Sequence, residues 1–292
     1  MTHYKDQTLL VTGAGGNLGR LAVEELLERG ATKIVAGTRD TAKLGDLAAK
    51  DVEVRHLDFD DAASVAKAFA GVDRLLLIST VAHNRIEQQG NAVAAAKAAG
   101  VKHIVYTSAP NARPNADAGG INDHYWTEQA IAASGLDFTL LRNHLYAEVT
   151  LMGVEHALAS GQIFNATNGG GRSYVTRADT ARTAAGALLS ADGKQVLDVT
   201  GPATVTQVEL AKLLSDISGK PLGAVGISPA QLTDGLTAAG LPPFMVTLLV
   251  AFDVDAAAGH HAIVNDTVER LSGRKPETLE SFLTANKAAL GA

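Results

Sequence analysis

The chain has 292 residues, of which 46% are hydrophobic and 19% are charged, with a formal net charge of −6 and no cysteine. This composition is enough for a buried core, and the length suits one cofactor-binding domain with a smaller appended lobe. The acidic balance argues against nucleic acid or an anionic membrane as a partner, and the lack of cysteine excludes disulfides and thiolate chemistry.

The first predicted unit is a buried strand over residues 9–11, a glycine-rich turn, and an amphipathic helix that stops at Gly30. In such a turn, Gly13 allows the tight exit from the strand, and Gly16 has no side chain to hold a pyrophosphate away from the backbone. Gly19 lets the helix pack closely, while the start of the helix offers unpaired N–H groups and a positive dipole end. The turn therefore predicts a dinucleotide phosphate site formed by Gly13, Gly15, Gly16, Asn17, Leu18 and Gly19.

Strands and helices then alternate five more times along the chain. Alternation with short links indicates parallel strands joined by right-handed helical crossovers, and so a Rossmann-type, doubly wound α/β sheet. We expect the further strands at Lys33–Thr38, Val52–Leu57, Arg74–Ser79, His103–Ser108 and Phe138–Arg142, with helices around 41–49, 61–70, 86–99 and 123–134.

The alternation loosens beyond residue 147, where a glycine loop at 169–171, a helix over 205–218 and a break at 240–243 follow. We predict a Rossmann domain over 1–147, to which some later segments return, and a smaller α-rich lobe over 148–292, with the ligand cleft between them. The longest apolar-rich stretch, residues 244–252, is far short of the roughly 20 residues that span a bilayer, and no secretion signal opens the chain. We therefore expect a cytoplasmic protein.

Arg39 closes the second predicted strand, where NAD-specific sites usually place a carboxylate that binds the ribose 2′-hydroxyl. An arginine can instead pair with the 2′-phosphate of NADPH, and a solvated surface arginine is the alternative. Asp40 is predicted to cap the helix that starts at Thr41, although it could also be the ribose acceptor of an NAD enzyme. Asp58, at the end of the third strand, lies either near the adenine or in a turn or cap.

These segments together resemble the NmrA-like branch of the atypical short-chain dehydrogenases, most closely the bacterial NADPH:quinone oxidoreductases and the triphenylmethane reductases. The likeness covers nearly the whole chain and is carried by the stretches 11–19, 38–40, 75–80, 95–101, 106–108, 124–128, 140–143, 176–179 and 271–274. The resemblance implies NADPH binding by the glycine turn and Arg39. It also implies contacts on the nicotinamide side from Ser79, Thr80, Thr107, Ser108, Arg142 and Asn143.

The sequence departs from the short-chain dehydrogenases in lacking their acid, a tyrosine followed four residues later by lysine. His124 and Glu128 stand on one helix face where that pair is expected, and we consider His124 an active-site group that titrates near neutrality. The alternative is a histidine that only makes local hydrogen bonds. The candidate catalytic residues are His124, Asn143 and Tyr146.

The missing acid favours an acceptor whose reduced form is a weak base, because water could then deliver the proton. The predicted function is an NADPH-dependent transfer of a hydride to a quinone or similar small conjugated acceptor. The alternatives are the reduction of a carbonyl or activated C=C bond, and a non-catalytic NADP sensor. The acceptor pocket could be lined by His144 and by the apolar residues Phe244, Met245, Leu248 and Phe252, for which core packing is the alternative. The histidine spacing favours no metal site, and a homodimer is compatible with the sequence.

Overall fold

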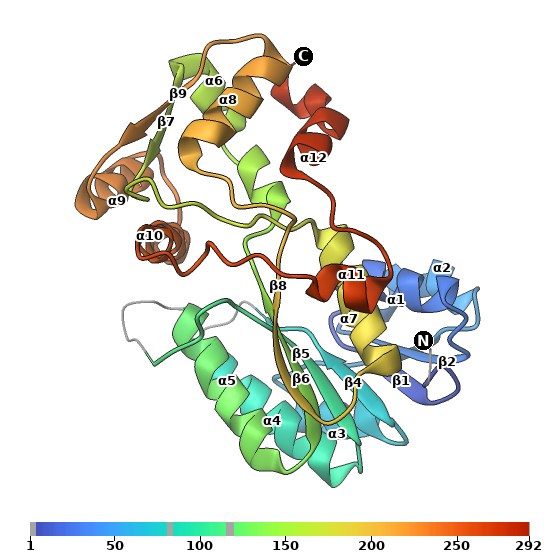
Figure 1. Cartoon of the computed structure of the whole chain (residues 1–292). Helices are drawn as coiled ribbons and strands as arrows, with labels where there is room; N and C mark the ends of the chain where they lie inside the picture. The colour runs from blue at the N-terminus through green and yellow to red at the C-terminus, as the bar shows by residue number, and fades with distance from the viewer. Residues whose placement is uncertain (1–3, 81–83, 115–119, 292) are drawn as a thin grey trace.

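The structure of the protein is a computed structural model that describes residues 4–80, 84–114 and 120–291. Figure 1 shows a lower layer, in which helices cover both faces of a sheet, and an upper lobe built mainly from the C-terminal half. The sheet has seven parallel strands in the order β3-β2-β1-β4-β5-β6-β8. Their bounds are β1 (Thr8–Val11), β2 (Lys33–Thr38), β3 (Glu53–His56), β4 (Arg74–Leu77), β5 (His103–Ser108), β6 (Asp137–Asn143) and β8 (Lys194–Val199).

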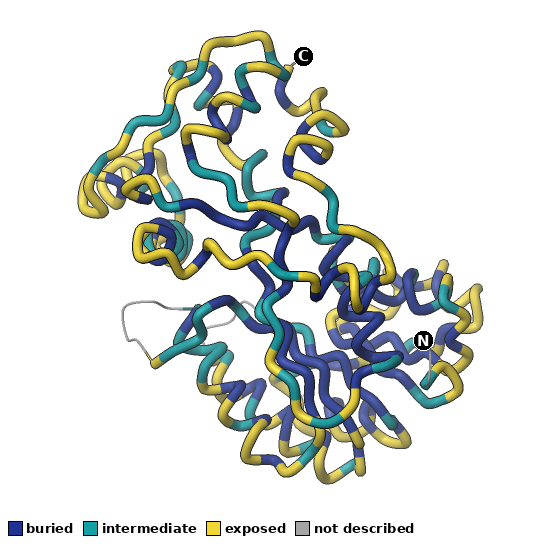
Figure 2. The backbone as a smooth tube through the Cα atoms, viewed as in Figure 1, coloured by how far each residue is buried: buried dark blue, intermediate teal, exposed yellow. Residues whose placement is uncertain are grey.

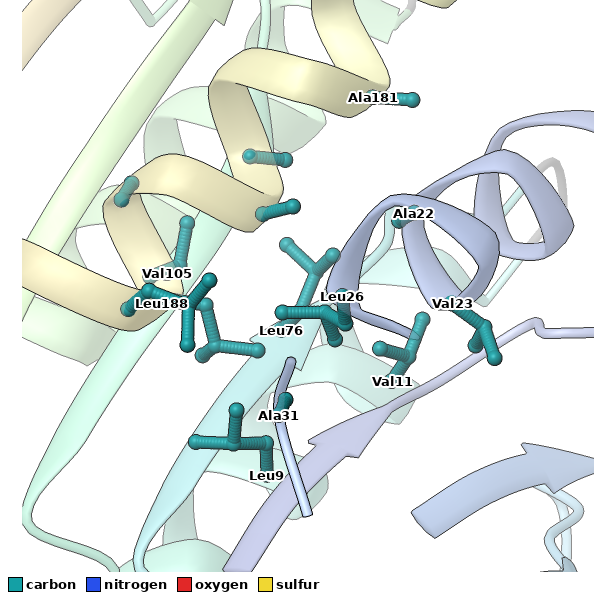
Figure 3. Close-up of a cluster of buried hydrophobic side chains, with 14 of the residues drawn as sticks. Leu9, Val11, Ala22, Val23, Leu26, Ala31, Leu76, Val105, Ala181 and Leu188 are labelled. Atoms are coloured by element: carbon teal, nitrogen blue, oxygen red, sulfur yellow. The ribbon is translucent and has the colours of Figure 1, made fainter. Parts of the chain in front are cut away.

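Alternate residues of β1 show how the two faces of the sheet are covered. Leu9 and Val11 belong to the core beneath α1 (Asn17–Glu28), α7 (Arg177–Ser190) and α11 (Thr267–Ser272). Leu10 belongs to the opposite core, beneath α3 (Ala62–Phe69), α4 (Arg85–Ala98) and α5 (Gly120–Ser134). Figure 3 shows side chains of the first core, including Leu9, Leu26 and Leu188, converging between strand and helices. Because successive side chains of a strand point to opposite faces, a continuous apolar run indicates this two-sided burial.

The strand order reverses between β1 and β4. From β1 the chain builds outward through β2 and β3, and it then returns to place β4 on the other side of β1. The helical crossovers that diverge here leave a crevice at the carboxyl ends of these strands, where open α/β sheets bind their ligands. The predicted doubly wound architecture is confirmed.

The main differences from the predicted elements lie after residue 147. The seventh strand, β8, was not predicted, and it pairs with β6 through contacts such as Leu140 with Val196. Helices α7 and α11 also pack on this layer (Figure 1). We keep 1–147 and 148–292 as a proposed division, in which α7, β8 and α11 return from the second half to the first.

The upper lobe is more irregular and has a small sheet of its own. A two-stranded parallel sheet of β7 (Gln162–Asn165) and β9 (Gly223–Gly226) adds strands to a lobe predicted as α-rich. Its other elements are η3 (Ala147–Leu151), α6 (Val154–Ser160), α8 (Gln207–Ser218), α9 (Pro229–Ala238), α10 (Pro243–Ala257), α12 (Leu279–Ala285) and η4 (Lys287–Leu290).

Local sequence signals set several boundaries in this lobe. Thr206 and Glu209 form a capping box that begins α8, and Gly219 ends the helix in the left-handed conformation. Figure 2 shows buried strands in the lower layer and exposed outer faces on many of the helices. Of the helices in the described ranges, none is long and apolar enough to cross a membrane.

Candidate active site

The glycine turn after β1 holds its shape because side chains are absent at defined places. Gly13 has φ +61°, in the left-handed region, and accepts a hydrogen bond from the Gly16 N–H at 2.9 Å. A Cβ at Gly19 would lie 2.3 Å from the Gly13 carbonyl oxygen, so only glycine lets α1 pack this close to the turn. Helix α1 begins without a side-chain cap and without an acidic residue in its first turn. Its first N–H groups and its dipole are therefore available to an anion.

A cleft of about 440 Å³ opens beside this turn, at the carboxyl ends of β1 and β2. The structure brings six of the predicted cofactor residues to its wall. Asn17, Leu18 and Gly19 are not among the lining residues and lie in the first turn of α1. The wall is formed by Gly13, Gly15, Gly16, Thr38, Arg39, Asp40, Lys43, Leu57, Asp58, Phe59, Asp60, Thr80 and Gln88.

Two cations lie at one end of the cleft. Arg39 is exposed, and its guanidinium has no hydrogen bond or ion pair with the described part of the chain. Lys43 was missed by the sequence analysis, and its Nζ is 3.6 Å from a carboxylate oxygen of Asp40. Asp40 caps the short 3-10 helix η1 (Thr41–Leu44) by accepting the Ala42 N–H, as predicted. The sequence feature that could have indicated Lys43 as a cleft residue is its position in the first helical turn after Arg39.

Part of the rim of the cleft is a network of polar side chains. Gln88, on α4, donates to Asp60 at 2.7 Å and accepts from the Thr80 hydroxyl at 3.2 Å. The hydrogen bond from Gln88 holds the pKa of the Asp60 carboxyl below its usual value. Asp58 accepts the Asp60 N–H at 3.1 Å, so it makes a turn and lines the cleft as well. This rim joins the loop after β3 to the start of α4.

The predicted nicotinamide-side residues gather at the ends of β4, β5 and β6, where several bond to one another. The Ser79 N–H donates to the Thr107 hydroxyl at 2.9 Å. The Ser108 hydroxyl donates to Glu128 at 2.6 Å, and Arg142 binds the same carboxylate at 3.0 and 2.7 Å. Glu128 is buried, so this pairing balances its charge. The sequence had placed Glu128 on α5 without predicting its partners.

Asn143 ends β6 and carries an unmet hydrogen-bonding group. It is buried, and its Oδ1 has no hydrogen-bond partner within the residues that the structure describes. Its Nδ2 lies 3.4 Å from the Tyr146 hydroxyl. Burial raises the pKa of Tyr146, and the Arg177 guanidinium lies 5.4 Å from the centre of its ring. A buried acceptor without a donor fits a bound amide N–H at this position.

His124 does not titrate near neutrality, which corrects the prediction made for it. Arg85 donates to its Nε2 at 3.2 Å, and because arginine cannot accept, that nitrogen carries no proton. The proton sits on Nδ1, which is 2.8 Å from the Tyr106 hydroxyl. Burial, and then the charge of Arg85, lower the pKa of His124 to about 3. The geometry therefore matches the alternative of a histidine bonded within the structure.

The other residues considered for the acceptor pocket do not lie together in one pocket. His144 is buried and lies 2.9 Å from the Ser173 hydroxyl and 3.2 Å from Asp198, so it faces the protein interior. Phe252 lines a separate pocket of the upper lobe, and Phe244 is half exposed. Leu248 faces α5, because a Cβ at Gly120 would lie 3.7 Å from its Cδ1. Helix α10 thus lies over the start of α5 (Figure 1).

Comparison with known proteins gives consistent matches over most of the chain. Residues 13–191 match a protein family described as NAD(P)H-binding. Quinone oxidoreductase 2 of Escherichia coli (strain K12) is 37% identical over 275 residues, which are 93% of this chain and 96% of that protein. NAD(P)H azoreductase of Xenophilus azovorans is 27% identical, over 97% of this chain and 99% of that protein.

Solved structures extend the same likeness to three dimensions. An NADPH-dependent quinone oxidoreductase of Escherichia coli, complexed with NADPH, superposes with a TM-score of 0.89 at 35% identity, covering 98% of this chain and 100% of that one. The triphenylmethane reductase of Citrobacter sp., complexed with NADP(H), gives a TM-score of 0.87 at 32% identity, covering 96% and 100%.

Proposed function

Because the chain belongs to the NAD(P)H-binding family and is an NADPH-dependent oxidoreductase, we propose that it transfers a hydride to a quinone or a similar conjugated acceptor. The similar proteins named for quinone, azo compound and triphenylmethane dye reduction support this class of acceptor. The observation that carries the proposal is the cleft that joins the glycine turn to Arg39 and Lys43 at the reversal point of the sheet.

The residues present fit NADPH along the length of this edge of the sheet. The uncapped N-terminus of α1 would hold the pyrophosphate, where Gly16 leaves room for it. Arg39 and Lys43 would hold the 2′-phosphate, since both are cations that line the cleft, Arg39 directly after β2 and Lys43 in η1. The unpaired Oδ1 of Asn143 would accept the carboxamide N–H of the nicotinamide. When bound, NADPH supplies the hydride.

The protonation states around the strand ends favour a conjugated acceptor over an isolated ketone. Burial raises the pKa of Tyr146 and of Tyr106, which makes both weaker acids. His124 is neutral, and its one proton faces Tyr106. A reduced quinone spreads its negative charge over the ring and can take a proton from water. The residues at the strand ends therefore need only to position the acceptor.

The test measures NADPH oxidation by stopped-flow absorbance with a panel of quinones, azo and triphenylmethane dyes, enones and aldehydes. We expect rapid oxidation with quinones or dyes and little with simple aldehydes. A preference for simple aldehydes or enones would favour reduction of a carbonyl or activated C=C bond. Tight NADPH binding with no oxidation by any acceptor would support a redox sensor, and either result would refute the proposal.

The cofactor assignment is tested in parallel by the substitution Arg39→Ala. Native protein should bind NADPH at least about tenfold more tightly than NADH, because a hydrogen bond to a charged group contributes about 1.5–3 kcal/mol. Arg39→Ala should remove most of this difference while leaving NADH affinity nearly unchanged. The control is Arg55→Ala, which changes an arginine outside the cleft. Equal affinities of native protein for the two nucleotides would show that Arg39 does not select the phosphate.

A further inference from the structure

Arg20 ties the helix of the glycine turn to the segment that carries Lys43. It follows Gly19 in α1, and its backbone N–H donates to the Gly16 carbonyl at 3.0 Å. Its side chain crosses to the chain after β2, where Nη1 donates to Asp46 at 2.7 Å. Its Nη2 donates to Asp46 at 3.2 Å and to the Lys43 carbonyl at 2.9 Å. One guanidinium therefore binds the same short segment at several points.

The contact of Arg20 with Asp46 is a bidentate pair between a planar guanidinium and a carboxylate. Such a pair fixes direction as well as distance. The hydrogen bond from Arg20 holds the pKa of the Asp46 carboxyl below its usual value, so this carboxyl is charged at neutral pH. Neither Arg20 nor Asp46 lines the nucleotide cleft, whereas Lys43 does. An influence of Arg20 on a bound nucleotide therefore passes through the segment that it holds.

The two cations of the cleft differ in what anchors their backbone. His56 Nδ1 donates to the Arg39 carbonyl at 3.1 Å, so the end of β3 holds Arg39 in place. The Lys43 N–H donates to the Asp40 carbonyl at 3.4 Å, beyond the usual range of about 2.7–3.2 Å. The Lys43 carbonyl is the atom that Arg20 binds. Arg20 therefore bears on the position of Lys43 more than on that of Arg39.

We propose that Arg20 is a positioning residue that favours NADPH over NADH by holding Lys43 at the place of the 2′-phosphate. This inference rests on the proposed binding of that phosphate by Arg39 and Lys43. The start of α1 is the proposed pyrophosphate site, so a bond from α1 to Lys43 fixes the distance between the two phosphate sites. A fixed distance lowers the cost of ordering the segment when the nucleotide binds. NADH lacks the 2′-phosphate, so its affinity does not depend on this bond.

The experiment measures the affinities of full-length protein for NADPH and NADH by isothermal titration calorimetry. We expect Arg20→Gln to weaken NADPH binding by about threefold or more, the partial loss of one hydrogen bond to a charged group, and NADH binding by less than about twofold. Arg20→Lys should also weaken NADPH binding, because lysine keeps the charge and loses the planar fork. Glu24→Gln is the matched control, since Glu24 lies 3.7 Å from the same guanidinium but belongs to α1 itself.

Two further variants separate positioning from simple charge. Asp46→Ala removes a negative charge, which by itself would tighten the binding of an anion. If Arg20 acts by positioning, the same variant instead weakens NADPH binding, because the guanidinium loses the partner that directs it. In a Lys43→Ala background, Arg20→Gln should have no further effect on NADPH affinity, since the two changes act on one contact.

The outcomes distinguish this inference from the proposed phosphate site. If native protein prefers NADPH and Arg20→Gln keeps that preference, the inference is wrong and the phosphate site stands. Equal native affinities for the two nucleotides would overturn both. Tighter NADPH binding by Asp46→Ala, or native affinity in Arg20→Lys, would show that charge alone acts.

A measurement of stability excludes a merely structural role for Arg20. Arg20 and Asp46 are both partly exposed, and such a pair contributes little to stability, so the urea midpoint of Arg20→Gln should stay close to that of native protein. A large fall in the midpoint, together with equal losses of NADPH and NADH affinity, would overturn the inference.

Discussion

At the scale of single residues, the fixed charge of Arg85 decides what His124 can do. An arginine that donates to Nε2 leaves the imidazole only one proton, which faces Tyr106 in the interior. The ion pair of Arg85 with Asp123, at 3.3 Å, holds the guanidinium in that place. His124 therefore links α4, α5 and β5, and it has no proton to donate toward an acceptor.

We expect His124→Gln to lower quinone-dependent turnover by less than about a hundredfold, the smaller end of what a general acid contributes. The shape of the turnover profile between about pH 5 and 8 should stay unchanged, because a histidine with a pKa of about 3 does not titrate there. Steady-state rates across that range would check this, with Tyr106→Phe as a companion variant that removes the facing hydroxyl. The loss of an ionisation near pH 6 or 7 in His124→Gln alone would mean that the histidine does act as an acid.

At the scale of elements, one buried and one partly buried arginine tie the returning helices to the first half of the chain. Arg74, on β4, is 3% exposed and donates to the carbonyls of Leu188 and Ala191 at 2.6 Å each, at the end of α7. Arg29, after α1, donates to the Ser272 carbonyl at 2.8 Å at the end of α11. The last carbonyls of a helix lack internal partners, so each arginine satisfies such groups, and those that Arg74 satisfies would otherwise be buried unpaired.

We expect Arg74→Met to lower the free energy of unfolding by about 2–4 kcal/mol, since it leaves two buried carbonyls without donors. Urea denaturation followed by circular dichroism would measure the loss. Arg55→Met is the comparison: Arg55 donates to the carbonyls of Ala68 and Ala70 at the end of α3, partly exposed. Water can replace it there, so its loss should be less than half as large. Equal losses for the two variants would argue against a special role of burial at Arg74.

At the scale of the whole molecule, three histidines in different parts of the fold have strongly lowered pKa values. Burial lowers the pKa of His103, His124 and His261 to about 3 in each case. In the unfolded chain the same side chains have a pKa of about 6.5. Between these values the unfolded state binds more protons than the folded state, so stability rises with pH. The contribution is complete above about pH 6.5 and is lost as the pH falls toward about 3.

We therefore expect the urea midpoint to fall steadily as the pH is lowered from about 7 to 5, a range above the titration of ordinary carboxylates. His103→Gln should make this dependence shallower by up to about 1.4 kcal/mol per pH unit, the slope for one proton. The glutamine can still reach the Thr139 hydroxyl, which lies 3.0 Å from the histidine Nε2. His56→Gln, at an exposed position, is the control. A midpoint independent of pH in this range would show that these histidines are not held neutral.

The two lobes are also joined across the molecule by an ion pair. Arg113, in the loop after β5, binds Asp255 of α10 through two bonds of 2.6 and 3.0 Å, and Asp255 is buried. A bidentate pair with a buried carboxylate fixes direction as well as distance. This ion pair holds α10 over the start of α5. It therefore helps to fix the distance between the upper lobe and the carboxyl ends of the sheet strands.

The sequence by itself determined the features that depend on short-range physics. The glycine turn, the cap at Asp40 and the two-sided burial of Leu9 and Leu10 follow from backbone freedom, local hydrogen bonds and side-chain periodicity. These signals predicted the positions of the first six strands along the chain, and the motifs they carry indicated the family.

Only the tertiary structure decided which distant residues meet. Strand β8 joins the sheet through pairing with β6, more than fifty residues earlier, and its own composition does not reveal that partner. Glu128 is held by hydrogen bonds from Ser108 and Arg142. The pKa of His124 is lowered by burial and by the charge of Arg85. Hydrogen-bond partners and desolvation are properties of groups brought together by folding, so no pattern within one segment of the chain can express them.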